Sequence, residues 1–327
     1  MMSDGSALYA LAAFTVVAAA TGPLIGFLRS WRLIDVPNER SSHLAPTPTG
    51  GGIVIVLAVL PLWSLSTPGG AFYLLIPAAG LAVLSLWDDF KGLGAPARLA
   101  GHFVAVAAVL YADPALAGAA ARILPAPAAI TVTALAWVWF INLFNFMDGV
   151  DGIAGVETLT IGLGVALLAV AGGIGQDLAG AGLITGAATL GFLIWNWHPA
   201  RIFMGDVGSV PLGFLLGWLL LSLAAEGAWA AALILPGYYL ADATITLIHR
   251  AMRGEAVWRA HRSHFYQRSA QNGLGHHEVS GMVLICNAAL ILLAFASMSG
   301  PVWACIALAA AAVGGLLLLF SGAGGKS

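Results

Sequence analysis

The chain has 327 residues, of which 60% are hydrophobic and only 9% are charged, and its mean hydropathy is +0.92. A soluble domain usually carries about 25% charged residues, so this composition excludes a water-soluble globular fold and indicates a protein whose solvent is lipid. The formal net charge is −2 and no run of basic residues occurs, which argues against a nucleic-acid partner.

Membrane-spanning helices are predicted along the whole chain, and no strand pattern is evident. A helix needs about 20 apolar residues to cross a bilayer, and the first stretch, residues 8–28, is too long for a cleaved signal sequence. Eleven spans are predicted, with the fourth the shortest: 7–28, 51–67, 71–87, 99–112, 128–144, 153–173, 179–195, 208–224, 228–248, 279–298 and 301–320. No long polar segment separates them, so residues 1–327 are expected to form one all-α polytopic membrane domain. Cys286 and Cys305 lie in apolar segments and are expected in the core.

The charged residues predict how these spans are oriented. With the N-terminus outside, the cytoplasmic segments are residues 29–50, 88–98, 145–152, 196–207, 249–278 and the C-terminal tail. Twelve of the thirteen basic residues then lie inside and only Arg122 lies outside, as the positive-inside rule requires. Most carboxylates and histidines fall on the same side. We therefore expect one composite site facing the cytoplasm.

The first cytoplasmic loop, from Asp35 to Gly52, includes the segment Asn38 to His43 and then a run rich in proline and glycine. These residues are expected to rigidify the loop. Its glycines, residues 50–52, could cradle a phosphate, although a lone glycine-rich turn is weak evidence. Thr47 is taken as a candidate substrate-binding residue.

Asp88 and Asp89 lie side by side at the end of the third predicted span, followed by Lys91. Two adjacent carboxylates repel each other, and a divalent cation or the proton of a lipid phosphate would relieve that repulsion. The alternative is a simple interfacial charge cap that Lys91 stabilises.

Polar residues also gather where the fifth span ends, over residues 142–152. If the helix continues there, Asn142, Asn145 and Asp148 recur on roughly one face, and Asp151 follows. Carboxamides and carboxylates at this spacing suit a nucleotide or sugar hydroxyls. The two Asp-Gly pairs could instead be plain turns.

Before the eighth span, the chain carries Asn196, Phe203 and Asp206, the last between Gly205 and Gly208. A helix start is a natural place for an anionic phosphate, to which Mg²⁺ on Asp206 could bridge, and Phe203 could stack on a base. Alternatively, Asp206 or Ser209 merely caps the helix.

The longest cytoplasmic loop contains His261, His264 and Arg268, with His276 and His277 beyond them. Histidine and arginine at these spacings can clamp a pyrophosphate. Zinc is the competing ligand, but two histidines without cysteine are insufficient to hold it. A solvated basic loop is the third interpretation.

In this order, the five elements resemble the polyprenyl-phosphate N-acetylhexosamine-1-phosphate transferases of glycosyltransferase family 4, over nearly the whole segment from Asp35 to Arg268. The resemblance implies ten or eleven helices, a cytoplasmic site and Mg²⁺, with Mn²⁺ as the alternative ion. The implied substrates are a UDP-N-acetylhexosamine and undecaprenyl phosphate in the membrane, and the products are UMP and an undecaprenyl-diphosphate sugar. A homodimer is a further partner expectation.

The resemblance also implies roles for single residues. Asp206, with Asp88, is similar to the family's metal ligands, and Asp88 with Asp89 resembles the acidic pair that handles the lipid phosphate. The catalytic set implied is Asp88, Asp89, Asp148, His261 and His264. The substrate-binding set implied is Thr47, Lys91, Asn142, Asn145, Asp151, Asn196, Phe203 and Arg268.

The motifs from Asp35 to His43 and from His261 to Arg268 resemble the O-antigen and capsule branch, which starts surface polysaccharides on FucNAc, QuiNAc or GlcNAc. The triple-histidine run of the pentapeptide transferases is absent, which argues against cell-wall precursor synthesis. The alternatives are a GlcNAc-1-phosphate transferase for another envelope glycan and, in another class, an ion-coupled transporter. A transporter needs polar groups near the bilayer centre, where Asp242 is expected, but most polar groups lie at one interface.

Overall fold

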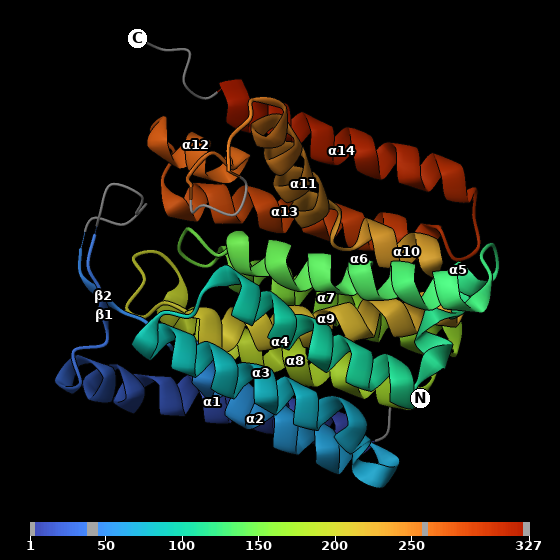
Figure 1. Ribbon diagram of the computed structural model, residues 1–327, viewed down its shortest axis with the longest axis horizontal. Helices are drawn as coiled ribbons and strands as arrows, with labels where there is room; N and C mark the ends of the chain where they lie inside the picture. The colour runs from blue at the N-terminus through green and yellow to red at the C-terminus, as the bar shows by residue number, and fades with distance from the viewer. Residues whose placement is uncertain (1–3, 38–44, 257–260, 323–327) are drawn as a thin grey trace.

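The computed structural model describes residues 4–37, 45–256 and 261–322, in which most of the long helices lie side by side (Figure 1). The α-helices are α1 (Asp4–Ser30), α2 (Gly52–Ser66), α3 (Phe72–Lys91), α4 (Ala95–Ala112), α5 (Gly118–Ala121), α6 (Ala126–Phe146), α7 (Ile153–Gly172), α8 (Gln176–Asn196), α9 (Asp206–Ala225), α10 (Trp229–Ile234), α11 (Gly237–Met252), α12 (Phe265–Gln271), α13 (His276–Ala296) and α14 (Val302–Gly322). Short 3₁₀ turns occupy Pro68–Ala71 and Pro114–Ala117.

Nine of the helices in the described ranges are long and apolar enough to cross a membrane: α1, α3, α4, α6, α7, α8, α9, α13 and α14. The chain is therefore an all-α, multi-pass membrane protein. The predicted second span is the shorter helix α2. The predicted ninth span, residues 228–248, is wrong as a single helix, because the chain breaks between α10 and α11 at Leu235 and Pro236. Figure 1 shows α11 running steeply across the direction of the other helices. The total of eleven spans stays a prediction.

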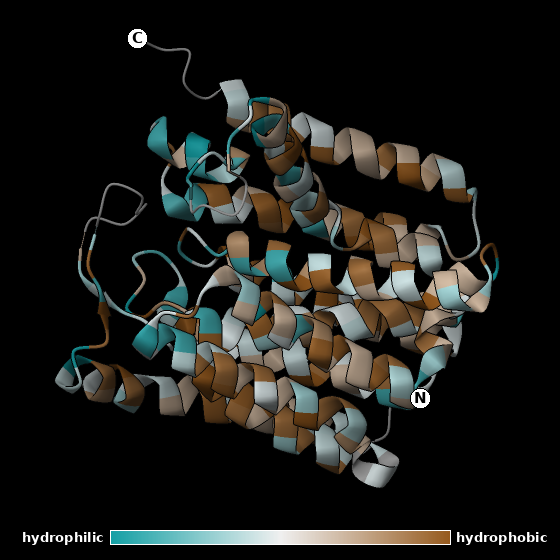
Figure 2. Ribbon diagram, viewed as in Figure 1, coloured by the Kyte–Doolittle hydropathy of each residue, from teal (hydrophilic) through white to brown (hydrophobic). Residues whose placement is uncertain are grey.

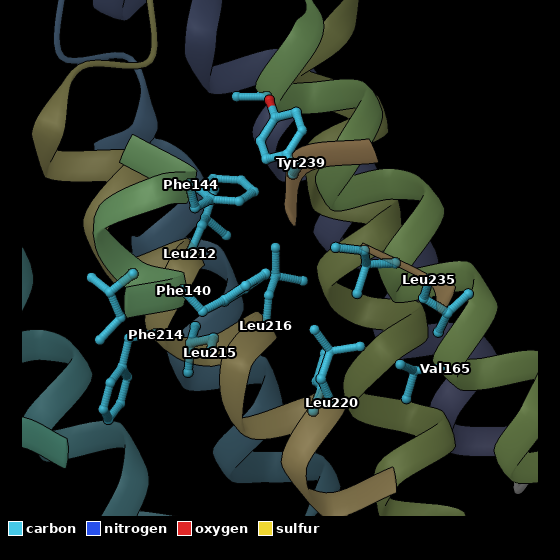
Figure 3. Close-up of a cluster of buried hydrophobic side chains, with 14 of the residues drawn as sticks. Phe140, Phe144, Val165, Leu212, Phe214, Leu215, Leu216, Leu220, Leu235 and Tyr239 are labelled. Atoms are coloured by element: carbon cyan, nitrogen blue, oxygen red, sulfur yellow. The ribbon is translucent and has the colours of Figure 1, made fainter. Parts of the chain in front are cut away.

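Three helices form the centre of the bundle. Most of the spanning window is buried in α9 (83%), α7 (78%) and α8 (72%), against 28% in α1, α3, α4 and α14, whose outer faces carry apolar side chains suited to lipid. Figure 3 shows leucines of α9 packed between Phe140 and Phe144 of α6 and Val165 of α7. The central position of α9 holds its first residue, Asp206, in a rigid setting.

Glycine permits the close packing of the central helices. A Cβ atom on Gly162 of α7 would lie 2.7 Å from the carbonyl oxygen of Gly182 in α8, and one on Gly182 would lie 2.6 Å from that of Gly162. Small residues that let helix backbones approach are typical of packing in lipid. Cys286 and Cys305 are buried and unbonded to each other, which confirms the expectation that they are core residues.

The polar residues concentrate at one end of the bundle, as the charge pattern predicts (Figure 2). The loops after α1, α6 and α8 meet there, and α12 lies beside them. One correction is the minimal antiparallel pair of β1 (Ile34–Asp35) and β2 (Thr47–Pro48), which no strand pattern had indicated. Residues 38–44 of the first loop, including the Asn38 to His43 motif, lie outside the described residues, as do residues 257–260.

Candidate active site

Three carboxylates gather where α3, α4 and α9 meet. Nη1 of Arg98 lies 3.1 Å from Oδ2 of Asp88 and 3.6 Å from Oδ2 of Asp206, so one guanidinium contacts both acids. Asp88 also accepts a hydrogen bond from the backbone N–H of Leu93. Asp89 lies close enough to Asp206 and Asp88 to feel their charges, and accepts from the N–H of Val207. The structure thus brings together the two acidic motifs that the sequence separates by more than a hundred residues.

The acidic cluster of Asp88, Asp89 and Asp206 fits a hard divalent cation. Carboxylate oxygens are the ligands that Mg²⁺ prefers, and Mg²⁺ usually takes only one or two of them together with phosphate oxygens and water. Within the described part of the chain, the guanidinium of Arg98 contacts this cluster and balances part of its charge. Asp206 and Asp88, the two carboxylates that Arg98 joins, are the residues that would hold such a cation.

Asp206 is positioned by Asn145, whose Nδ2 donates to Asp206 Oδ1 at 3.0 Å and to Ser209 Oγ at 3.0 Å. The capping alternative is wrong, because the residue at the N-cap of α9 is Gly205 and no side chain caps the helix. Asp206 is instead the first helical residue, where a carboxylate interacts favourably with the helix dipole.

The face proposed for Asn142, Asn145 and Asp148 is only partly formed. Helix α6 ends at Phe146, so Asp148 lies in the following loop. Asn142 lies one turn farther into the bundle and contacts His102 Nδ1 at 3.2 Å and the carbonyl of Val138 at 2.7 Å. Of the three, Asn145 makes the contact with Asp206.

Asp148 has an unusual titration. Burial, followed by the negative charges of Asp206 and then Asp151, raises the pKa of Asp148 to about 7. A carboxyl group with this pKa exchanges a proton near neutral pH, which suits general acid or base chemistry.

Two glycines of the first loop pack the chain against the segment that leads into α9. The N–H groups of Gly51 and Gly52 donate to the carbonyls of Phe203 and Met204, at 2.9 Å each, and are not available to a ligand. A Cβ atom on Gly52 would lie 2.2 Å from Cα of Gly208. Glycine is required there because the starts of α2 and α9 touch.

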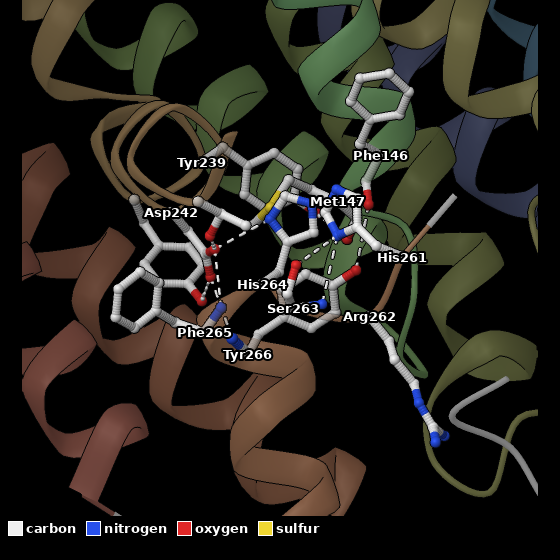
Figure 4. A network of polar contacts seen from close by, with 12 residues as sticks. Phe146, Met147, Tyr239, Asp242, His261, Arg262, Ser263, His264, Phe265 and Tyr266 are labelled. Carbon is white, nitrogen blue, oxygen red and sulfur yellow. Dashed lines mark hydrogen bonds and ion pairs between the residues drawn. The ribbon is translucent and has the colours of Figure 1, made fainter. Parts of the chain in front are cut away.

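The histidine loop is built around a buried carboxylate, Asp242 of α11 (Figure 4). Its oxygens contact His264 Nδ1 at 3.2 Å and accept from the backbone N–H groups of Phe265 at 3.0 Å and Tyr266 at 3.1 Å. Tyr238 and Thr246 donate to the same carboxylate. Asp242 therefore fixes the start of α12 and the orientation of His264.

The ring of His261 stacks on that of His264, with centroids 4.8 Å apart. Burial, and then the positive charges of His264 and Arg250, lower the pKa of His261 to about 4. His261 is therefore neutral at pH 7, and it can donate to a phosphate but cannot pair with it as a cation. Tyr266 links this loop to the end of α6, since its hydroxyl donates to the carbonyl of Phe146 at 3.3 Å.

Asp151 is bonded to two histidines and to a backbone N–H. His198 Nδ1 lies 2.6 Å from its Oδ2 and His276 Nδ1 lies 3.2 Å from its Oδ1, while the N–H of Ala200 donates to Oδ2 at 3.1 Å. Burial alone raises the pKa of Asp151, but the hydrogen bonds from His276, Ala200 and His198 outweigh it and leave the pKa below its ordinary value.

Comparison with known proteins shows which family this chain belongs to. The sequence model of glycosyl transferase family 4 matches residues 71–224, which carry both acidic motifs. The phospho-N-acetylmuramoyl-pentapeptide-transferase of Moorella thermoacetica is 30% identical, over 89% of this chain and 98% of that protein. The chain belongs to this family, the polyprenyl-phosphate N-acetylhexosamine-1-phosphate transferases.

Other relatives are named for the transfer of N-acetylglucosamine phosphate. The decaprenyl-phosphate N-acetylglucosaminephosphotransferase of Mycobacterium tuberculosis (strain CDC 1551 / Oshkosh) is 28% identical, over 84% of this chain and 78% of that protein. The probable undecaprenyl-phosphate N-acetylglucosaminyl 1-phosphate transferase of Bacillus subtilis (strain 168) is 28% identical, over 83% and 78%. All three relatives are named for transfer of a sugar phosphate to a polyprenyl phosphate or for the pentapeptide reaction.

Several residues that family resemblance assigns to substrate make other contacts in this member. Asn196 is buried, and its amide joins the N–H of Gly152 to the carbonyl of Ile202, so it holds two loops together. Thr47 is buried and donates to the carbonyl of Ala45. The charged ends of Lys91 and Arg268 lie over the aromatic rings of Trp87 and Phe265. Phe203 is half-buried, and its backbone is hydrogen-bonded to Pro48 and Gly51.

Two site features were not expected from sequence. Arg98 follows Asp88 by ten residues on a different helix, and no periodicity links residues on either side of the turn at Gly92. Glu157 is fully buried in the membrane-spanning helix α7, with Asn287 of α13 donating to it at 2.7 Å. The position of Glu157 within the apolar run that begins at Ile153 could have indicated a buried acid.

Proposed function

We propose that this chain transfers a sugar 1-phosphate from a UDP-N-acetylhexosamine to undecaprenyl phosphate, releasing UMP and forming an undecaprenyl-diphosphate sugar. The observation that carries the proposal is the convergence of Asp88, Asp89, Asn145 and Asp206 at the polar end of a membrane bundle of this family. At this end of the bundle, the diphosphate of the UDP-sugar would lie next to the phosphate of a lipid acceptor in the membrane.

In the proposed reaction, an oxygen of the lipid phosphate attacks the β-phosphorus of the UDP-sugar. A new P–O bond forms there, and the bond from the β-phosphorus to the bridging oxygen breaks, so that UMP leaves with that oxygen. A bound Mg²⁺ would screen the negative charges of the two substrates, and Asp206 with Asp88 would hold it.

Asp88 is the residue proposed to accept the proton of the lipid phosphate. Its carboxylate is held in place by Arg98 and by the N–H of Leu93. The second pKa of a phosphate monoester is about 6, so most of the acceptor is already ionised at pH 7. We infer that base catalysis contributes modestly and that substrate positioning and charge screening dominate.

The neutral His261 and the oriented His264 are proposed to bind phosphate oxygens, and Asn145 and Asp148 to lie close to the nucleotide sugar. Within the family, the first-loop and histidine motifs favour the branch that initiates O-antigen or capsule synthesis on FucNAc, QuiNAc or GlcNAc. Another envelope glycan built on GlcNAc is the second candidate, because relatives named for GlcNAc-phosphate transfer match over most of the chain. The proposed location is the bacterial inner membrane, with the site at the cytoplasmic face.

The decisive experiment supplies purified protein with Mg²⁺, undecaprenyl phosphate and a panel of UDP-sugars, and measures UMP. We expect UMP to form with one or a few N-acetylated amino sugars, only when the lipid acceptor is present. UMP formation from none of them would contradict the transferase proposal and revive the transporter alternative. Exchange of labelled UMP into UDP-sugar without lipid would instead indicate an aspartate nucleophile and a covalent intermediate.

A further inference from the structure

A second cluster of ligating side chains lies apart from the acidic cluster. Among the described residues, Asp151, His198 and His276 are the one group of three or more histidine, cysteine or acidic side chains whose ligand atoms all lie within 4.8 Å of one another. The three come from the α6–α7 loop, the α8–α9 loop and the first turn of α13. We propose that they form a Zn²⁺ site, separate from the Mg²⁺ site expected at Asp206.

The donor set suits zinc. Two imidazole nitrogens and one carboxylate form a set that Zn²⁺ binds well and that Mg²⁺, which prefers oxygen, does not. Zinc bonds of about 2.0–2.1 Å in tetrahedral geometry place the ligand atoms about 3.3 Å apart. His276 Nδ1 is already 3.2 Å from Asp151, and His198 Nδ1, at 2.6 Å, needs to move by less than about 1 Å.

His276 Nδ1 points at Asp151. It lies 3.2 Å from Oδ1 and 3.4 Å from the backbone nitrogen of Asp151, so it can donate to the carboxylate or accept from the N–H, but one ring nitrogen cannot do both. Zn²⁺ at this position would bind the lone pair of Nδ1 and one carboxylate oxygen in place of that hydrogen bond.

The site is accessible and well supported. The side chain of His198 is 38% exposed, which opens the fourth position to water, whereas Asp151 is 7% exposed and His276 is 12% exposed. Ala200 holds the carboxylate and Ser280 holds the backbone of Asp151 by donating to its carbonyl at 2.7 Å. Bound zinc would lock the two loops that carry Asp148 and lead into Asp206, so it would rigidify the active-site end of the bundle.

The test titrates Zn²⁺ into chelator-stripped, full-length protein in detergent, in competition with a chromophoric chelator and in excess Mg²⁺. We expect one Zn²⁺ per chain, at least about 10-fold weaker binding in His198→Ala and in His276→Ala, and unchanged binding in the control His249→Ala, an exposed histidine of α11. His261→Ala should also bind as wild type does. Absence of stoichiometric zinc, displacement by Mg²⁺, or wild-type affinity in His198→Ala would overturn the proposal.

A second measurement does not depend on how the variants fold. X-ray absorption at the zinc edge of the wild-type protein should show two imidazole ligands and light-atom neighbours at about 2.0–2.1 Å. A spectrum without imidazole would assign the ion to the acidic cluster and refute the site. Both readouts are independent of transferase activity, so failure of the proposed reaction would leave them unaffected.

Discussion

Asp206→Asn tests the central assignment of the acidic cluster. The substitution keeps the size of the side chain, and the amide oxygen can still accept the hydrogen bond that Asn145 donates at 3.0 Å. Gly205 is the N-cap of α9, so no capping bond is lost. The helix dipole loses a favourable charge worth about 0.3–1 kcal/mol, but repulsion from Asp88 and Asp89 is relieved. We therefore expect the free energy of unfolding to change by less than about 1 kcal/mol.

The effect on turnover should be much larger. Two unit charges about 4 Å apart interact by about 4 kcal/mol at an effective dielectric of 20. The substrates add several negative charges to a site where Arg98 is the cation that contacts the carboxylates among the described residues. Asp88 and Asp89 remain to hold a cation in part. We expect kcat to fall at least about 100-fold, equivalent to about 2.7 kcal/mol, and the residual activity to need more Mg²⁺.

The assay is UMP release by purified protein over a Mg²⁺ titration, with thermal unfolding measured in parallel. Asp177→Asn is the matched control, since Asp177 is an exposed acid in the first turn of α8 and has no contact with the acidic cluster. Turnover close to wild type in Asp206→Asn, with unchanged Mg²⁺ dependence, would refute the metal-binding role of Asp206.

Three further predictions follow from the structure. The pKa of Asp148 is about 7 in the folded protein, against about 3.9 in an unfolded chain, so its contribution to stability is full below about pH 4 and is lost as the pH rises to about 7. The Tm of Asp148→Asn should therefore exceed that of the wild type by a margin that grows over this pH range. A difference in Tm that does not change with pH would contradict the raised pKa of Asp148. Asp242→Ala leaves several buried donors unpaired and should lower the stability by about 3 kcal/mol or more, measured by thermal unfolding, whereas Asp177→Ala should change it little; equal effects would exclude the anchoring role. Single cysteines at the exposed positions Ala95 and Asn272 should resist a membrane-impermeant thiol reagent in intact cells and react after permeabilisation, while one at Asp177 should react in both; labelling of Ala95 from outside would reverse the proposed orientation.

The class of fold and the general region of the site follow from local properties of the chain. Long apolar runs require helices in lipid, since backbone groups in a bilayer must be bonded within the chain, and nine such helices are present among the described residues. The clusters near Asp88, Asn145 and Asp206 lie at the ends of those runs, so their meeting at one end of the bundle could be predicted. Local composition was sufficient for the helical fold and for the position of the polar clusters, because both depend on apolar segments of about 20 residues.

The contacts between side chains depend instead on how the helices pack. Arg98 reaches Asp88 and Asp206 because a turn brings α4 back beside α3, and this contact has no periodic pattern in the sequence. The glycines before α2 pack against α9, since their role depends on how closely those two helix starts approach. Asp151 meets His198 and His276 across three segments, and contacts between distant segments are set by helix packing. The break between α10 and α11 lies at Pro236, but a proline alone does not predict it, because α1, α3 and α9 each continue through an internal proline.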